Sequence, residues 1–325
     1  MKRLIVILFT VILILATSSA WAQKTVRWSI ATGSMGGIYY PLGRGMANVI
    51  SKYIPYAEAV AEVTNGSADN CRLVGMRKAE LALVMADTAW DAYQGRTKFR
   101  EKIPLRAMAV LYPNNMHIVT VEGKGIEQVT DLKGKRVSTG APGSGTEIMA
   151  MRILEAYGLN PDKDMKRDRL PPNESSVALK DKKIDAFFWS GGLPTSSITD
   201  LGAPPAIKMK LISHADALPK MREKYGPLYV KGIIPAKTYP GQMVDAEIAV
   251  VWNLLVCREN MKENMAYDIV KTIFDHKSEL ALSHNETRNI SLEPQAAGGS
   301  PIPFQPGAIR FFTEKGIKMK GSSLN

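Results

Sequence analysis

Two glycine-rich segments recur in the same setting in the two halves of the chain. Gly33–Pro41 (GSMGGIYYP) and Gly140–Glu147 (GAPGSGTE) each follow a β-branched strand pattern and precede a helical pattern. Gly36 and Gly143 are separated by the same number of residues as Gly33 and Gly140. Apolar strands that alternate with helices indicate parallel sheets covered on both faces. The chain is therefore predicted to be an α/β protein with two lobes.

Two further landmarks follow the glycine segments in the same order. An Asn-x-Ser turn occurs at 65–67 and again at 173–175, and a buried-strand pattern follows it at 80–85 and at 185–189. The spacing between the halves stays nearly constant. Because ligands of parallel sheets bind at the carboxyl ends of the strands, these turns mark one candidate site.

The glycine segments are candidate anion-binding turns. Each would open a helix, so that free backbone N–H groups and the positive end of the helix dipole point into one space. The alternative is ordinary strand-to-helix punctuation, for which glycine is the usual residue. Neither segment fits the G-x-G-x-x-G or P-loop pattern of nucleotide sites.

The first 22 residues have the pattern of a secretory signal peptide. Lys2 and Arg3 precede an apolar run, and Ala20-Trp-Ala22 supplies a cleavage site. An uncleaved membrane anchor is the alternative, although the apolar run is shorter than the ~20 residues that a membrane-spanning helix needs. We therefore expect a cleaved, periplasmic protein.

The formal net charge of +11 admits nucleic acid, an acidic surface or a small anion as a partner. Export and the even spread of Lys and Arg argue against nucleic acid, and a basic surface that favours solubility explains most of the charge. Cys71 and Cys257 lie in apolar contexts. We expect two buried free thiols, with a disulfide as the alternative.

Several candidate residues have a structural alternative. Tyr39 and Tyr40 cannot both be buried on one helix face, and we expect Tyr39 to face the cleft. Trp189 ends a buried strand and is expected in the cleft wall rather than the core. Asp87 is a candidate both for binding a ligand ammonium and for capping the next helix. Asn65 and Ser67 are candidates for ligand contact, for helix capping, or for both.

Patterns of enzymes and metal sites are absent from the sequence. It contains no G-x-S-x-G, S-x-x-K or H-E-x-x-H motif, and its four histidines are scattered. We therefore expect no catalytic residues, no metal and no cofactor.

Long motifs resemble the TAXI family of solute receptors, which serve TRAP transporters. They occupy residues 32–43, 140–158 and 183–195, and the segments 249–256 and 301–308 resemble the family too. The resemblance covers essentially the whole mature chain. It implies a periplasmic-binding-protein type II fold, in which two Rossmann-like lobes are joined by a strand hinge.

The resemblance also implies a function and a ligand shell. The ligand would be a small carboxylate, such as an acidic amino acid, a 2-oxoacid or a dicarboxylate, delivered by a monomer to TRAP membrane subunits, separate or fused. Met35 and Met85 depart from the family pattern and suggest a more apolar solute. The implied shell is Ser34, Gly36, Gly37, Tyr39, Asn65, Ser67, Ser144, Gly145, Thr146, Trp189 and Gly191.

The lobes are expected to divide at 122 and 245. Residues 23–122 and 246–325 would form lobe 1, and residues 123–245 would form lobe 2, with the strand pattern at 248–257 returning the chain to lobe 1. A periplasmic sensor that reports to a signalling protein, and an enzyme on the same fold, remain the rival hypotheses.

Overall fold

One mixed β-sheet runs through the part of the chain that the computed structural model describes, residues 25–296 and 300–319. The signal peptide expected at residues 1–22 lies outside these ranges. The strands are β1 (Val26–Ala31), β2 (Ala57–Glu62), β3 (Leu81–Met85), β4 (Leu105–Val121), β5 (Arg136–Ser138), β6 (Lys166–Asp168), β7 (Ala186–Gly191), β8 (Met209–Leu211), β9 (Val230–Ile234) and β10 (Ala246–Arg258).

Helices connect most of the strands and close the chain. No helix among the described residues is long and apolar enough to cross a membrane. The α-helices are α2 (Tyr39–Tyr53), α3 (Ser67–Gly75), α4 (Ala86–Gln94), α5 (Gly145–Ala156), α6 (Pro172–Lys180), α7 (Ser196–Gly202), α8 (Leu218–Tyr225), α9 (Glu263–Asp275), α10 (Lys277–Leu280), α11 (Glu293–Ala296) and α12 (Pro306–Glu314), and the 3₁₀ helices are η1 (Val129–Leu132), η2 (Ala215–Ala217) and η3 (Asn285–Asn289).

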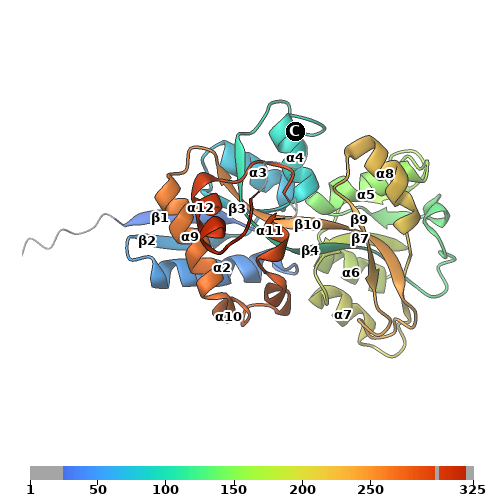
Figure 1. Ribbon diagram of the computed structural model, residues 1–325. Coiled ribbons are helices and arrows are strands. Elements are labelled where there is room, and N and C mark those ends of the chain that lie inside the picture. The colour runs from blue at the N-terminus through green and yellow to red at the C-terminus, as the bar shows by residue number, and fades with distance from the viewer. Residues whose placement is uncertain (1–24, 297–299, 320–325) are drawn as a thin grey trace, which may run out of the picture.

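The elements form two lobes that lie side by side (Figure 1). Lobe 1 holds β1–β3, α2–α4 and α9–α12, and lobe 2 holds β5–β9 and α5–α8. The strand order is β2-β1-β3-β10-β4-β7-β5-β6, with β8 beside β4 and β9 beside β10. The outer strands pair in parallel within each lobe, whereas β4 and β10 run antiparallel to their neighbours.

Strands β4 and β10 belong to both lobes. Residues 253–257 of β10 pair with β3 in lobe 1, and residues 246–250 pair with β9 in lobe 2. Strand β4 pairs along β10 and then, over residues 115–120, with β7 of lobe 2. The chain therefore changes lobes inside these two strands rather than at their ends.

The sequence pattern predicts two strands, 107–111 and 117–122, joined by a loop at 112–116, but this prediction is wrong, because β4 is one strand of 17 residues. Pro113 lies inside it and pairs with Trp252 next to an irregularity in the β10 register. Proline lacks the N–H that a regular ladder uses, and a bulge tolerates that loss. The turn-like residues 112–116 thus lie in a continuous strand.

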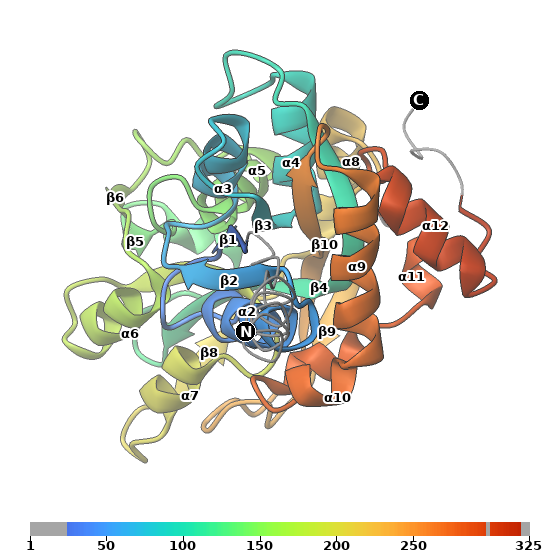
Figure 2. The ribbon, with the colours of Figure 1, turned by 90° about the vertical axis from the view of Figure 1, so that its left-hand side faces the viewer.

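Both faces of the sheet are covered by helices. In β3, Leu81 and Leu83 pack with the buried residues of α2, while Ala82 and Val84 pack with those of α3. Figure 2 shows α2 and α3 on opposite sides of β2. Side chains that alternate between two apolar faces explain the continuous apolar run of this strand.

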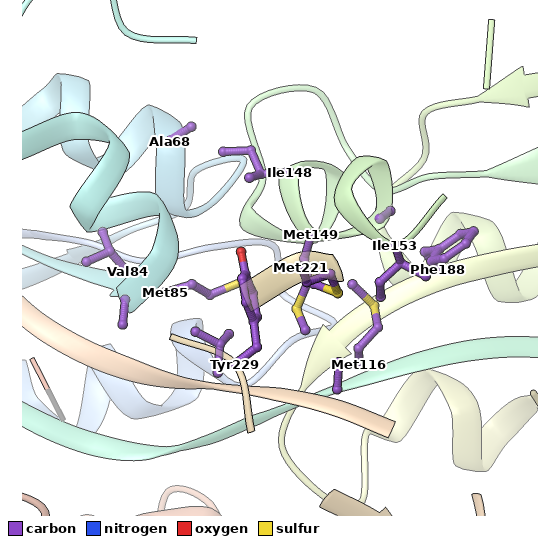
Figure 3. Packing of buried hydrophobic residues seen from close by; sticks show 14 of the residues in the cluster. Ala68, Val84, Met85, Met116, Ile148, Met149, Ile153, Phe188, Met221 and Tyr229 are labelled. Carbon is purple, nitrogen blue, oxygen red and sulfur yellow. The ribbon is translucent and has the colours of Figure 1, made fainter. Parts of the chain in front are cut away.

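One hydrophobic core spans the two lobes. It includes Val84 and Met85 of lobe 1 together with Met149, Phe188 and Tyr229 of lobe 2. Figure 3 shows these side chains meeting near the crossing strands. The expected free thiols are also buried, Cys71 in this core and Cys257 in the separate core of lobe 1.

Candidate functional site

A pocket with about 420 Å³ of atom-free space lies between the lobes at the carboxyl ends of β1, β3 and β7. Ten of the twelve predicted site residues line it; Gly36 and Asp87 do not. The full lining is Gly33, Ser34, Gly37, Ile38, Tyr39, Asn65, Gly66, Ser67, Met85, Tyr112, Asn114, Ser144, Gly145, Thr146, Trp189, Ser190 and Gly191.

Helix α5 points its N-terminus into this pocket from lobe 2. Gly145 and Thr146 are its first residues, and an α-helix provides no acceptor for N–H groups in this position. The Thr146 hydroxyl accepts the Ser190 N–H at 3.2 Å, which leaves its own proton available. This end of the pocket therefore presents donors and a positive helix dipole.

Helices α2 and α3 bring two more N-termini to the same space from lobe 1. Ile38 and Tyr39 stand at the start of α2, and Gly66 and Ser67 stand at the start of α3, and all four line the pocket. Three helix dipoles thus converge on one cavity. Such an arrangement favours a bound anion without requiring a cationic side chain.

The start of α3 is also where the lobes touch. The N–H groups of Ala68 and Asp69 donate to the Gly143 carbonyl oxygen of lobe 2 at 3.0 and 3.2 Å. Gly36 meets lobe 2 in a similar way, because a Cβ at this position would lie 2.0 Å from Asn173 Oδ1. Gly36 and Gly143 therefore lie where the two lobes contact each other in this closed arrangement.

Trp189 forms a wall of the pocket, as its place at the end of β7 predicted. Its indole N–H donates to Thr195 Oγ1 at 2.9 Å, which fixes the ring. A Cβ on Gly37 of lobe 1 would lie 2.9 Å from the ring. Glycine at position 37 is thus required for the close approach of lobe 1 to this ring.

Tyr39 lines the pocket, whereas Tyr40 does not. The Tyr39 hydroxyl donates to Asn253 Oδ1 of the crossing strand β10. Burial raises the pKa of Tyr39 above its ordinary value, and the nearby Asp87 adds to the effect. The phenol is therefore a neutral hydrogen-bonding group at neutral pH.

Three buried polar atoms of the pocket lining have no hydrogen-bond partner within the described residues. They are Tyr112 Oη, Asn114 Oδ1 and Ser190 Oγ. A buried polar atom without a partner is costly, so each is a candidate contact for a bound molecule or for water. Sequence reasoning missed Ser190, and it missed Tyr112 and Asn114 because it placed them in a loop, although their i, i+2 spacing puts them on one strand face.

Ser144 has a structural role that the expected ligand shell did not include. Its hydroxyl donates to the Ala141 carbonyl at 2.7 Å and accepts the Glu147 N–H at 3.1 Å, which makes it the N-cap of α5. Since the hydroxyl proton is already used, Ser144 positions the helix start rather than donating to a ligand from this side chain. Asn65 is similarly engaged, donating to Asp69 Oδ2 at 2.7 Å.

Asp87 is not placed to bind a ligand ammonium, which corrects one of its two expected roles. Its carboxylate is fully buried and accepts from Tyr229 Oη at 2.9 Å and from Arg152 Nη1 at 3.4 Å. It also accepts the Thr88 N–H at 2.7 Å in the first turn of α4. Burial raises the pKa of Asp87, and Arg152 offsets part of that effect.

Glu147 gathers cations beside the start of α5. Its buried carboxylate pairs with Lys98 of lobe 1 and with Arg167 and Arg169 of lobe 2. Burial raises its pKa, but the hydrogen bonds from Lys98 and Arg169 outweigh this and hold the pKa below its usual value. Three cations on one carboxylate leave positive charge close to the pocket.

The lining contains no Asp, Glu, Lys, Arg, His or Cys. Across the described ranges, no group of three or more His, Cys, Asp or Glu side chains is arranged to hold a metal ion. The pocket can therefore offer hydrogen bonds and helix dipoles but no general base or cysteine nucleophile of its own.

The two lobes, the crossing strands and the pocket between them define a periplasmic-binding-protein type II fold. Solved structures agree on this fold. A protein of Bordetella bronchiseptica RB50 is 17% identical to this chain with a TM-score of 0.54, and the match covers 93% of this chain and 84% of the Bordetella chain. L-arginine-bound Tv2483 is 12% identical with a TM-score of 0.50, covering 84% and 93%. The chain belongs to the NMT1-like family, whose model matches residues 30–316.

A third structure, XAC2383 from Xanthomonas citri bound to ATP, is 9% identical with a TM-score of 0.51, and covers 89% of this chain and 94% of its own. Tv2483 holds L-arginine and XAC2383 holds ATP, so these two ligands differ. The comparisons therefore establish the fold and the family, and the ligand has to be argued from the pocket.

Proposed function

We propose that the protein is a periplasmic solute receptor that captures a small carboxylate between its lobes and delivers it to a membrane transporter. The observation that carries the proposal is the convergence of the α2, α3 and α5 N-termini on one interlobe pocket. The N-termini of α2 and α5 can offer backbone N–H donors to a carboxylate, while α3, whose Ala68 and Asp69 N–H groups already bond to Gly143, adds its helix dipole.

Buried atoms support the same proposal. Tyr112 Oη and Ser190 Oγ lack partners in the described structure, and both belong to residues of the pocket lining. The hydroxyl groups can donate to a carboxylate or to a polar group next to it. A ligand in the closed cleft would thus satisfy atoms that the protein alone leaves unpaired.

Closure is the signal that we propose the transporter recognises. The Gly143 carbonyl bonds to α3, and the Lys98–Glu147 ion pair also joins the lobes. A ligand that contacts both lobes favours this state by its differential affinity. The TAXI-type motifs around residues 32–43 and 140–158 favour a TRAP transporter as the partner, and the N-terminal pattern favours export to the periplasm.

A thermal-shift screen of the mature protein tests the proposal. The protein is unfolded and refolded to remove carried-over ligand, then screened against amino acids, 2-oxoacids, other monocarboxylates, dicarboxylates, sugars and phosphates. A ligand at a hundred times its Kd adds about 2.7 kcal/mol to the stability of the folded state. Stabilisation by a class of carboxylates supports the receptor function, whereas stabilisation by sugars or phosphates alone contradicts it.

A further inference from the structure

We propose that the ligand is a monocarboxylate without an amino group, and that its apolar chain extends from the pocket into a second cavity at the mouth of the cleft. The inference rests on the proposed receptor function and narrows its ligand class. It depends on two observations: the absence of charged side chains from the pocket and the five lining residues that the pocket shares with the second cavity.

The first observation restricts the charge of the ligand. Three helix N-termini can balance one carboxylate, but no carboxylate side chain lines the pocket to receive an ammonium group. No Lys, Arg or His lines it to balance a second carboxylate. Because a buried charge without a partner is strongly disfavoured, amino acids and dicarboxylates fit this pocket poorly.

The nearest buried carboxylates are already engaged. Asp87 is held by Arg152 and Tyr229 behind the pocket. Glu286, near the pocket residue Tyr112, accepts the Leu193 N–H and the Asn289 side-chain amide at 2.6 Å. Neither side chain lines the pocket, so neither offers a free acceptor to an ammonium group.

The second observation locates the rest of the ligand. A further cavity, with about 760 Å³ of atom-free space, shares Ser34, Asn65, Ser144, Thr146 and Trp189 with the pocket. We call it the vestibule. The shared residues come from both lobes, so the vestibule lies next to the pocket, and we place there the part of the ligand that extends beyond the α5 N-terminus.

The vestibule presents apolar side chains from both lobes. Met35 and Val63 come from lobe 1 and are 68% and 53% exposed. Leu170, Pro171 and Pro172 face them from lobe 2. A branched alkyl or aryl chain would cover these apolar surfaces, whereas a short or charged chain would leave them in water.

Titration calorimetry with the refolded protein tests the ligand class. We expect 4-methyl-2-oxopentanoate or 3-phenyl-2-oxopropanoate to bind at least tenfold more tightly than pyruvate, and at least tenfold more tightly than leucine or phenylalanine. Tighter binding of glutamate, 2-oxoglutarate or any amino acid overturns this inference and leaves the receptor function in place. Failure of every carboxylate to bind overturns both proposals.

A pair of double variants tests the vestibule. Met35→Ser with Val63→Thr removes apolar surface at its lobe 1 side and changes exposed residues only. We expect it to weaken binding of the long-chain monocarboxylate at least fivefold and to change pyruvate binding less than twofold.

The matched control is Met243→Ser with Val244→Thr, at two exposed residues that line neither cavity. It should leave both affinities unchanged. Equal loss of long-chain and short-chain binding in the Met35/Val63 variant, or no loss of either, overturns the placement of the chain in the vestibule.

Discussion

Replacing Arg152 by methionine should destabilise the protein strongly, because the residue joins the lobes through a buried ion cluster. Arg152 is 3% exposed on α5 of lobe 2 and pairs with Asp87 and Asp91 on α4 of lobe 1. Its guanidinium also donates to Tyr229 Oη at 2.5 Å. Burial lowers the pKa of Arg152, but Tyr229 and the two carboxylates raise it by more than burial lowers it, so Arg152 is charged.

The size of the effect follows from the charges that remain. Arg152→Met keeps an apolar stem but leaves Asp87 and Asp91 buried without a cation, and breaking a buried pair in this way costs about 3–5 kcal/mol. Typical domains have about 5–15 kcal/mol of stability in total. Adding Asp87→Asn and Asp91→Asn should restore part of the loss, because no uncompensated charge then remains.

Urea unfolding at pH 7 measures this difference, with Arg310→Met as the control. The Arg310 side chain is 40% exposed and pairs with Glu263 at the surface, so its loss should cost at most about 1 kcal/mol. Burial already raises the pKa of Asp87, so the Asp87 carboxylate left without Arg152 should take up a proton in the folded state. The stability deficit should therefore narrow as the pH is lowered from 7 towards 5. An Arg152→Met deficit as small as that of Arg310→Met would refute the reasoning.

Three other predictions concern the site and its surroundings. Gly145→Ala places a Cβ 2.3 Å from Met85 Sδ and 2.8 Å from Ser67 Oγ across the closed cleft, and overpacking of about 1–3 kcal/mol should weaken ligand binding about 5- to 150-fold in calorimetry. Ser144→Ala should lower the free energy of unfolding by about 1 kcal/mol, and Ser144→Asp, which restores a cap, should recover most of it in urea titrations. Burial lowers the pKa values of His117 and His214 to about 4. Below pH 6.5 the unfolded chain therefore binds more protons than the folded protein. The wild type should lose stability as the pH falls from 6.5 towards 4, by up to about 1.4 kcal/mol per pH unit for each histidine. His214→Gln should flatten this slope, and an unchanged slope would exclude His214 as one of its sources.

The order of strands and helices was predictable because its signals are local. The glycine segments lie at the starts of α2 and α5, and the apolar run at 248–257 lies in β10, as predicted. The continuity of β4 was not predictable, since Pro113 and its neighbours have the composition of a turn. Only the pairing with β10, far along the chain, keeps these residues extended.

The residues that line the pocket also divide into those predictable from neighbouring residues and those that depend on distant strand pairing. Gly37, Gly145 and Thr146 were found because a helix start can be read from neighbouring residues. Asn114 and Ser190 were missed because their positions depend on pairings between distant strands, Asn114 with Val251 of β10 and Ser190 with Met116 of β4. The engagement of Asp87 by Arg152 joins residues 65 positions apart, and nothing around either residue indicates the other.

The central position of β10 also governs when the molecule can fold. This strand lies between β3 and β4, and its N-terminal half pairs with β9, so both lobes need it to complete their sheet. Synthesis proceeds at about 5–20 residues per second, so β10 follows β4 by on the order of ten seconds. Pairings between such distant segments form slowly. The nascent chain therefore remains incompletely folded until most of it has been made, a state that suits the export that we propose for this protein.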